Sequence, residues 1–140
     1  MLDNTIFVFG SNTAGRHGKG AALYAVTHRG AKYGVGEGLQ GQSYALPTKN
    51  GAIETRTMEE IEDSIMRFKE FAHKNPQLTF QVTRVGCGLA GLSDEQVYPL
   101  FKDAPANCWL PGIWEAKRSG VQRLLVAGSR TFEDYELMRN

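Results

Sequence analysis

Two glycine-rich segments of this sequence have the composition of anion-binding loops. Residues 7–22 (FVFGSNTAGRHGKGAA) and residues 82–97 (VTRVGCGLAGLSDEQV) each join an apolar run to a segment that is expected to be helical. Loops with so few side chains present bare backbone N–H groups beside a helix N-terminus, and such groups bind a diphosphate or a similar anion. Because ligands of open α/β sheets bind beyond the carboxyl ends of the strands, we expect both loops at one edge of a sheet.

The first loop does not have the spacing of a nucleoside-triphosphate P-loop. Gly18-Lys19 is followed by Gly20 rather than Ser or Thr, and position 13 is Thr rather than Gly. What remains is a run of glycines that leads into a helix, with Lys19 able to supply a positive charge to an anion. Taken alone, this loop is equally well interpreted as a surface turn whose glycines only satisfy backbone geometry.

Capping motifs mark the starts of two helices. Thr57 with Glu60, and Ser93 with Gln96, have the spacing of capping boxes. Apolar residues recur at three- and four-residue intervals after the first of these boxes. The sequence therefore predicts a helix over about 58–74 and a short helix after Ser93.

Apolar runs and turn residues predict the remaining elements. A helix is predicted over about 20–29, and strands are predicted over residues 5–10, 42–49, 78–85, 107–111 and 121–128. Residues 31–41 contain four glycines and no clean period, which predicts a mobile loop that could act as a flap over a ligand. This alternation of strands and helices is typical of a three-layer α/β/α domain with a mostly parallel mixed sheet.

Composition limits the classes of partner. A chain of 140 residues is long enough for one domain with a real core. The 16 basic and 15 acidic residues give a net charge of +1 and form no basic stripe, which argues against direct nucleic-acid binding. No signal peptide or membrane span is recognisable, so we expect a cytoplasmic protein with two free thiols and no membrane partner. His28, His73 and the cysteines lack metal-ligand spacing, so no metal site is predicted.

The order of these motifs resembles a macrodomain, the ADP-ribose-binding fold. The resemblance rests on GSNTAGRHGKGAALYAV, then YALPTK, then an amphipathic helix, then VTRVGCGLAGLSDEQV, and it covers roughly residues 5–115. It is most similar to the branch that contains terminal ADP-ribose protein glycohydrolase, and the GCGL-x-GL element is its most specific part. The resemblance implies a small-molecule partner, ADP-ribose or a related ribosyl nucleotide, and no cofactor.

The same resemblance implies two walls of a ribosyl diphosphate site. Ser11 and Asn12 would lie near the distal ribose, residues 15–21 would line one side of the diphosphate, and residues 86–92 would line the other. The implied ligand-binding residues are Ser11, Asn12, Gly15, His17, Gly18, Lys19, Gly20, Ala21, Gly86, Cys87, Gly88, Leu89, Ala90, Gly91 and Leu92.

Two of these residues, and both tryptophans of the chain, can be explained either by a role in the site or by ordinary packing. His17 could donate to a phosphate or face solvent from its loop. Cys87 is expected to be a small buried thiol rather than a nucleophile. Trp109 and Trp114 are expected to pack at the edge of the core rather than to stack on a base.

The catalytic machinery implied by the resemblance is incomplete. In the glycohydrolase branch, the Lys matched by Lys49 is implied to attack the anomeric carbon, and an Asp in the GCGL element assists release. Ala90 stands at the position of that Asp, so a general acid or base is missing. Lys49 can also be interpreted as a solvated lysine at a strand end, and Asp94 and Glu95 as ordinary acidic residues of a helix N-terminus.

Three functions follow from these observations. The leading expectation is a domain that binds ADP-ribose or a related ribosyl nucleotide with weak or absent hydrolase activity. The first alternative is an active ADP-ribosyl glycohydrolase that uses Lys49 to remove ADP-ribose from a modified protein or nucleic acid. The second alternative is an interaction domain that binds no ligand.

Both ends of the chain depart from the macrodomain pattern. Macrodomains usually carry one or two earlier strands that end in a Gly-Asp pair whose Asp contacts adenine, and this Asp has no counterpart here. Residues 115–120 (EAKRSG) are expected to be a linker. Residues 118–140 resemble the first strand, loop and helix of a SLOG nucleotide-binding domain, so either the chain is a fragment of a two-domain protein or residues 121–128 join the sheet of the domain at 1–117.

Overall fold

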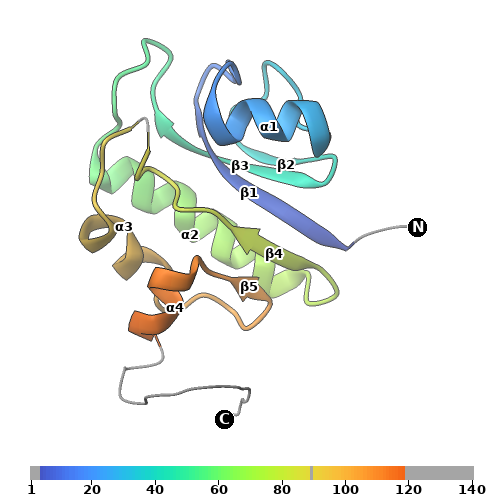
Figure 1. The fold of residues 1–140 in the computed structure, drawn as a ribbon, viewed down its shortest axis with the longest axis vertical. Helices are drawn as coiled ribbons and strands as arrows, with labels where there is room; N and C mark the ends of the chain where they lie inside the picture. Colours follow the sequence, from blue (N-terminus) through green and yellow to red (C-terminus); the bar gives the residue numbers. More distant parts are fainter. Residues whose placement is uncertain (1–3, 89, 119–140) are drawn as a thin grey trace.

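The computed structural model describes residues 4–88 and 90–118 of the chain. Helices and strands alternate, and Figure 1 shows them coloured along the sequence. Their order is β1 (Thr5–Asn12), α1 (Gly20–His28), β2 (Gly38–Gln40), β3 (Ser43–Lys49), α2 (Met58–Lys74), β4 (Thr79–Val82), α3 (Asp94–Phe101), β5 (Cys108–Trp109) and α4 (Gly112–Arg118).

The strands form one mixed sheet in the order β2-β3-β1-β4-β5. Strand β1 is parallel to both of its neighbours, β3 and β4, and β4 is parallel to β5. Among the strands of the described residues, β2 alone runs antiparallel to its neighbour, β3. The carboxyl ends of the three central strands therefore meet at one edge of the sheet. The two glycine-rich loops follow β1 and β4 and so lie at this edge, as expected.

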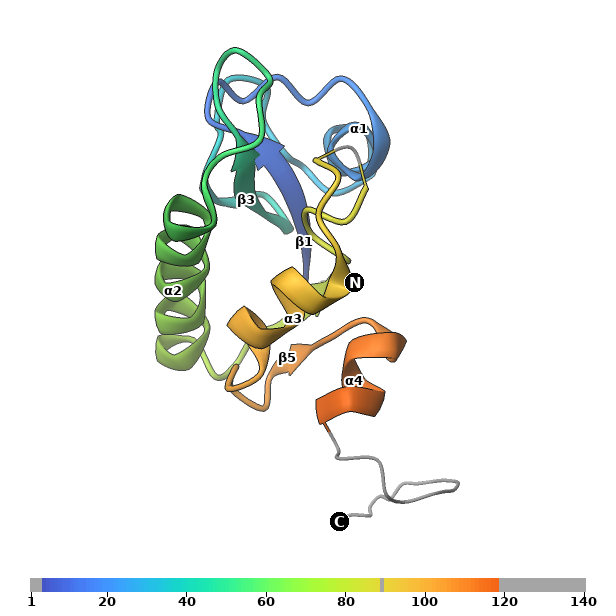
Figure 2. The same ribbon diagram turned by 90° about the vertical axis from the view of Figure 1, so that its left-hand side faces the viewer.

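Helices cover both faces of this sheet. Along β1, Ile6 and Val8 point to the face that packs against α2 and α3, whereas Phe9 points to the face that packs against α1. Figure 2 shows α1 and α2 on opposite sides of β1 and β3. The prediction of a three-layer α/β/α fold with a mostly parallel mixed sheet is confirmed.

Local sequence explains the two capped helices. The Thr57 hydroxyl accepts a hydrogen bond from Glu60 N at 3.1 Å, and the Glu60 carboxylate accepts one from Thr57 N at 3.0 Å. Ser93 and Gln96 form the same reciprocal pair at the start of α3. Helix α2 then buries Ile61, Ile65, Phe68 and Ala72 at the spacing of one helical face. The predictions of a helix over 58–74 and of a helix after Ser93 are confirmed.

The structure corrects two expectations. Residues 38–40, within the predicted loop 31–41, form strand β2, because β3 supplies the hydrogen-bonding partner for a segment with no period of its own. Residues 112–118 form helix α4 where a linker was expected to start at residue 115, and the fully buried Trp114 anchors this helix against Phe101, with ring centroids 5.4 Å apart. The strand predicted at 121–128 and almost all of the SLOG-like segment lie outside the described residues.

The tryptophans differ in their packing. Trp114 is buried in the core as expected, whereas Trp109 is 61% exposed on the edge strand β5, so the expectation that it packs into the core edge is wrong. No helix in the described part of the chain is both long and apolar enough to cross a membrane.

Candidate functional site

A cleft of about 700 Å³ opens at the carboxyl ends of β1, β3 and β4. Its walls are the loop between β1 and α1 and the loop between β4 and α3, which are the two glycine-rich segments. The ends of β1 and β3, together with the turn after β3, complete the lining. The parallel strands thus bring two loops that are about 70 residues apart in the chain to one place.

Four cationic side chains of the described residues line the cleft. Arg16 and Lys19 come from the first loop, Lys49 ends β3, and Arg84 lies at the start of the second loop. Among the described lining residues none is acidic. A concave surface whose described lining includes several cations and no carboxylate favours an anionic ligand.

The side chain of Asn12 fixes the first loop. Its Oδ1 accepts a hydrogen bond from Arg16 N at 2.8 Å, and its Nδ2 donates to Arg16 O at 2.9 Å. The Ser11 hydroxyl donates to Gly36 O at 2.5 Å, which ties the cleft to the segment between α1 and β2. Both residues line the cleft, and these polar atoms hold the surrounding backbone in place.

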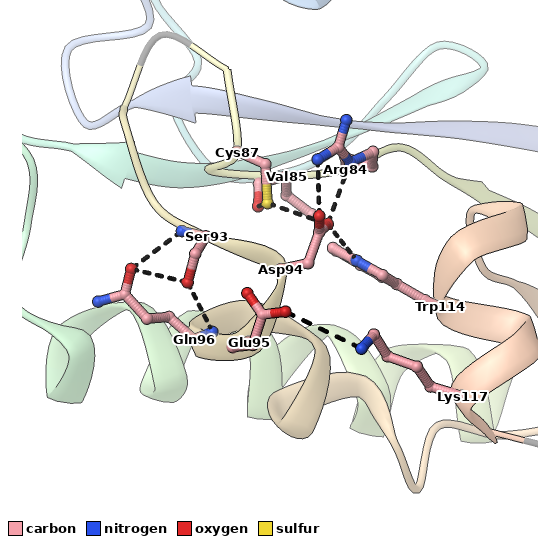
Figure 3. Close-up of polar contacts among 9 residues, drawn as sticks. All are labelled: Arg84, Val85, Cys87, Ser93, Asp94, Glu95, Gln96, Trp114 and Lys117. Atoms are coloured by element: carbon pink, nitrogen blue, oxygen red, sulfur yellow. Dashed lines mark hydrogen bonds and ion pairs between the residues drawn. The ribbon is translucent and has the colours of Figure 1, made fainter. Parts of the chain in front are cut away.

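Arg84 is held at the cleft by a carboxylate that lies behind it. Arg84 Nε and Nη2 donate to the two oxygens of Asp94 at 3.0 and 2.7 Å, and Trp114 Nε1 donates to Asp94 Oδ1 at 2.6 Å (Figure 3). The hydrogen bond from Arg84, followed by that from Trp114, lowers the pKa of Asp94 to about 2. The Asp94 side chain is only 13% exposed. Through Asp94, the hydrogen bonds connect the buried Trp114 to the Arg84 guanidinium, which lines the cleft.

Cys87 lies in the same network as a protonated thiol. Its Sγ is 3.7 Å from Asp94 Oδ1, in the geometry of a weak S–H donor. Burial, followed by the negative charge of Asp94, raises the pKa of the Cys87 thiol to about 11. The thiol is therefore un-ionised near neutral pH, which agrees with the expectation that it is not a nucleophile, although it is partly rather than fully buried.

Comparison with solved structures decides the fold. The DarTG protein of Thermosipho africanus, solved in complex with ADP-ribose, superposes with a TM-score of 0.55 at 19% identity, over 79% of this chain and 39% of that chain. A macrodomain protein from Streptomyces coelicolor superposes with a TM-score of 0.51 at 16% identity, over 79% of this chain and 88% of that chain. The chain has a macrodomain fold.

A third structure agrees with this assignment of fold. A protein of unknown function from Bacteroides thetaiotaomicron superposes with a TM-score of 0.56 at 13% identity, over 79% of this chain and 90% of that chain. The sequence matches no protein-family model and no curated protein. At these identities the likeness concerns the macrodomain fold, and the glycohydrolase branch and the SLOG-like tail remain predictions.

The macrodomain cleft brings together most of the residues expected at the site. Those that line it are Ser11, Asn12, Gly18, Lys19, Gly20, Ala21, Lys49, Gly86, Cys87, Gly88 and Ala90. Those that do not line it are Gly15, His17, Gly91 and Leu92, and Leu89 lies outside the described residues.

His17 packs beneath the first loop instead of facing the cleft. It is 1% exposed, its Nε2 is 3.0 Å from Val35 O, and its ring makes an edge contact with Phe9 at a centroid distance of 5.2 Å. The expectation of a solvent-facing residue is wrong, and His17 does not line the cleft. The reason is that the aromatic side chain of Phe9 and the segment around Val35 enclose the imidazole.

The other three residues outside the lining close the loops of the macrodomain cleft. Gly15 has φ of 73° and its Cα faces the backbone of Gly34, where a Cβ would collide. Leu92 N donates to Gly86 O at 2.8 Å, and the Leu92 side chain packs against the core. Gly91 has φ of 77° and its N–H donates to Gly88 O at 3.0 Å. These residues shape the two walls without lining the cleft.

Several lining residues fall outside the two walls that the macrodomain resemblance implies. They are Gly10, Ala22, Tyr33, Thr48, Ile53, Thr83, Arg84 and Val85. Thr83 and Arg84 begin the loop between β4 and α3, just before its first glycine, so their position in the sequence could have indicated them. Tyr33 lies in the segment 31–41 that was interpreted as a flap. Ile53 had no local signal, because only the course of the turn after β3 brings it to the cleft.

Proposed function

We propose that this cleft binds ADP-ribose or a related ribosyl nucleotide, with weak or absent hydrolase activity. The main observation behind this proposal is the composition of the cleft lining. It combines two glycine-rich loops with four cations, Arg16, Lys19, Lys49 and Arg84. Backbone N–H groups and cations together suit a diphosphate. The volume of about 700 Å³ falls in the range of small-molecule sites. A protein with a similar fold, DarTG, was solved in complex with ADP-ribose.

The absence of an acidic residue from the described lining of the cleft supports binding over hydrolysis. Cleavage of a glycosidic bond by a lysine nucleophile needs a partner that moves protons during release. Asp94 is engaged by Arg84 and Trp114 and stays ionised because its pKa is about 2. Ala90, at the position where the resemblance implies an Asp, has its backbone carbonyl bound by the Thr55 hydroxyl at 2.9 Å. We infer that the cleft retains its ligand.

An active glycohydrolase is the second candidate, and one observation favours it. Lys49 lies at the carboxyl end of β3 and lines the cleft, where an amine could reach a bound sugar. In this alternative, the carboxylate that assists release is not at the position of Ala90. It comes from another part of the complex between the enzyme and its modified substrate.

Titration calorimetry with ADP-ribose tests the binding proposal. We expect micromolar affinity for the wild-type protein and a loss of roughly tenfold in Lys19→Ala, because one cation that faces the diphosphate is removed. Lys32→Ala is the matched control, since Lys32 is exposed and does not line the cleft. Binding that is absent or only millimolar in the wild type would leave the interaction-domain alternative as the better explanation.

A release assay separates binding from hydrolysis. An ADP-ribosylated protein is incubated with the wild type and with Lys49→Ala, and free ADP-ribose is measured. We expect little release by either protein. Release by the wild type that disappears in Lys49→Ala, in a variant that still folds, would establish the glycohydrolase alternative.

A further inference from the structure

Ile53 has a backbone conformation that isoleucine rarely adopts. It lies in the turn between β3 and α2 with φ of 64°, and it is the one non-glycine residue with positive φ in residues 4–88 and 90–118. A β-branched side chain in this left-handed region crowds its own backbone, and glycine or asparagine would fit there with less strain.

The side chain of Ile53 is also exposed in an unfavourable place. It is 45% exposed and lines the cleft, next to cations that attract water and anions. Single exposed apolar residues are common on protein surfaces and need no explanation by themselves. An exposed apolar residue that is also strained is different, because a glycine would remove both unfavourable features. Strain of this kind concentrates at ligand-binding sites.

Other residues hold the turn in this shape. Asn50 Oδ1 accepts hydrogen bonds from Ala52 N at 2.8 Å and from Glu54 N at 3.0 Å. The turn is also tied to both walls of the cleft, because the Arg16 guanidinium donates to Gly51 O and the Thr55 hydroxyl donates to Ala90 O. Ile53 therefore lies in a turn that Asn50 holds from within and that is tied to both glycine-rich loops on either side of Ile53.

We propose that Ile53 is a ligand-contacting residue that packs on the uncharged face of the sugar next to the diphosphate. The cations and backbone N–H groups then bind the phosphates, and Ile53 selects for a sugar ring over a free phosphate or pyrophosphate. This inference rests on the proposed function, because the ligand is taken to be a ribosyl diphosphate. Burial of the side chain against the sugar offsets the strain only in the bound state.

Four variants test the inference with ADP-ribose as the probe. Ile53→Gly and Ile53→Ala remove the side chain, and we expect each to lower affinity about tenfold. Ile53→Val keeps the branched shape and removes one methylene, so about a threefold loss is expected. Ile113→Ala is the matched control, because Ile113 is 50% exposed on α4 and does not line the cleft, and its affinity should equal that of the wild type.

Thermal unfolding of the free variants tests the strain separately. Alanine is strained at this φ and glycine is not, so Ile53→Gly should unfold at a temperature roughly 3 °C higher than Ile53→Ala. This is the reverse of the order found at ordinary positions. Pyrophosphate is the companion ligand, and its affinity should be the same in the wild type and in the Ile53 variants.

Each outcome decides between the two proposals. If the wild type does not bind ADP-ribose, the proposed function fails and this inference fails with it. If the wild type binds and all Ile53 variants bind within twofold of it, only this inference is overturned. A loss confined to Ile53→Gly, with full affinity in Ile53→Ala, also overturns it, because that pattern reports a loosened turn rather than a lost contact. Equal losses of ADP-ribose and pyrophosphate affinity would overturn the selection for a sugar.

Discussion

At the scale of single residues, Arg84 lines the cleft, whereas Asp94, the carboxylate that orients its guanidinium, does not. Arg84 presents a guanidinium to the cleft while Asp94 lies behind it, held by Trp114 from the core. A cation fixed in this way loses less side-chain freedom when a ligand binds than a flexible lysine side chain would. The Asp94 side chain thus has a positioning role, although the sequence suggested only an acidic residue at a helix N-terminus.

The network around Asp94 predicts a specific loss of stability in acid. The folded protein holds the pKa of Asp94 at about 2, below its ordinary value of 3.8, so the ionised form stabilises the fold. This contribution is present above about pH 4 and is lost as the pH falls towards 2. We expect the free energy of unfolding of Asp94→Asn to fall less than that of the wild type across this window, as measured by denaturant titrations.

Asp103 provides the internal reference for that comparison. Its pKa is also lowered, by a hydrogen bond from Lys69, but it titrates in both proteins and cancels in the difference. Parallel pH profiles for the wild type and Asp94→Asn would contradict the role assigned to the network.

At the scale of elements, glycine serves two different purposes in the first loop. Gly15 is required by the fold, because its φ is 73° and its Cα faces the Gly34 backbone, so any side chain would displace the segment before β2. Apart from its chain neighbours, no atom of the described residues lies within 4 Å of where a Cβ of Gly18 would be, and Gly18 lines the cleft. The first glycine shapes the loop, and the second leaves open space in the cleft where we propose that the ligand binds.

Alanine substitutions should separate these purposes. Gly15→Ala is expected to lower the free energy of unfolding by more than about 1 kcal/mol, because it adds both strain and a collision. Gly18→Ala should change stability by less than about 0.5 kcal/mol but weaken ADP-ribose binding, because its methyl group enters the cleft. Denaturant unfolding and calorimetry measure the two effects. A stable Gly15→Ala protein, or a Gly18→Ala protein with full affinity, would contradict this assignment.

At the scale of the whole molecule, positive charge is local rather than general. The chain as a whole carries a net charge of +1, yet four cations line one cleft whose described residues include no carboxylate. The surface therefore offers little long-range attraction for a polyanion, and the potential is concentrated where a small anion fits.

This charge distribution predicts that ligand binding depends on salt. Between about 0.1 M and about 1 M NaCl the screening length falls from about 10 Å to about 3 Å, so ADP-ribose affinity should fall several-fold. The dependence should be shallower in Lys19→Ala and unchanged in Lys32→Ala. Calorimetry across this range measures it, and a salt-independent affinity would indicate that the cations do not contact the diphosphate.

Local patterns account for what could be predicted. Helix α2 was predictable because its capping box and its apolar face both lie within one window of the chain. The two glycine-rich loops were predictable as partners because parallel strands place their carboxyl ends together. Strand β2 and helix α4 were not, because β3 supplies the pairing for one and the burial of Trp114 supplies the anchor for the other.

By itself, the sequence determined the alternation of elements, the two loops and the macrodomain resemblance, because caps, periodicity and glycine spacing act over a few residues. Only the tertiary structure decided which side chains face the cleft. It buried His17 against Phe9, placed Asp94 behind Arg84, and carried Ile53 to the cleft on a turn tied to both walls. The physical reason is that these contacts form between residues on different elements or loops. The sequence contains no local motif or hydrophobic periodicity that indicates them.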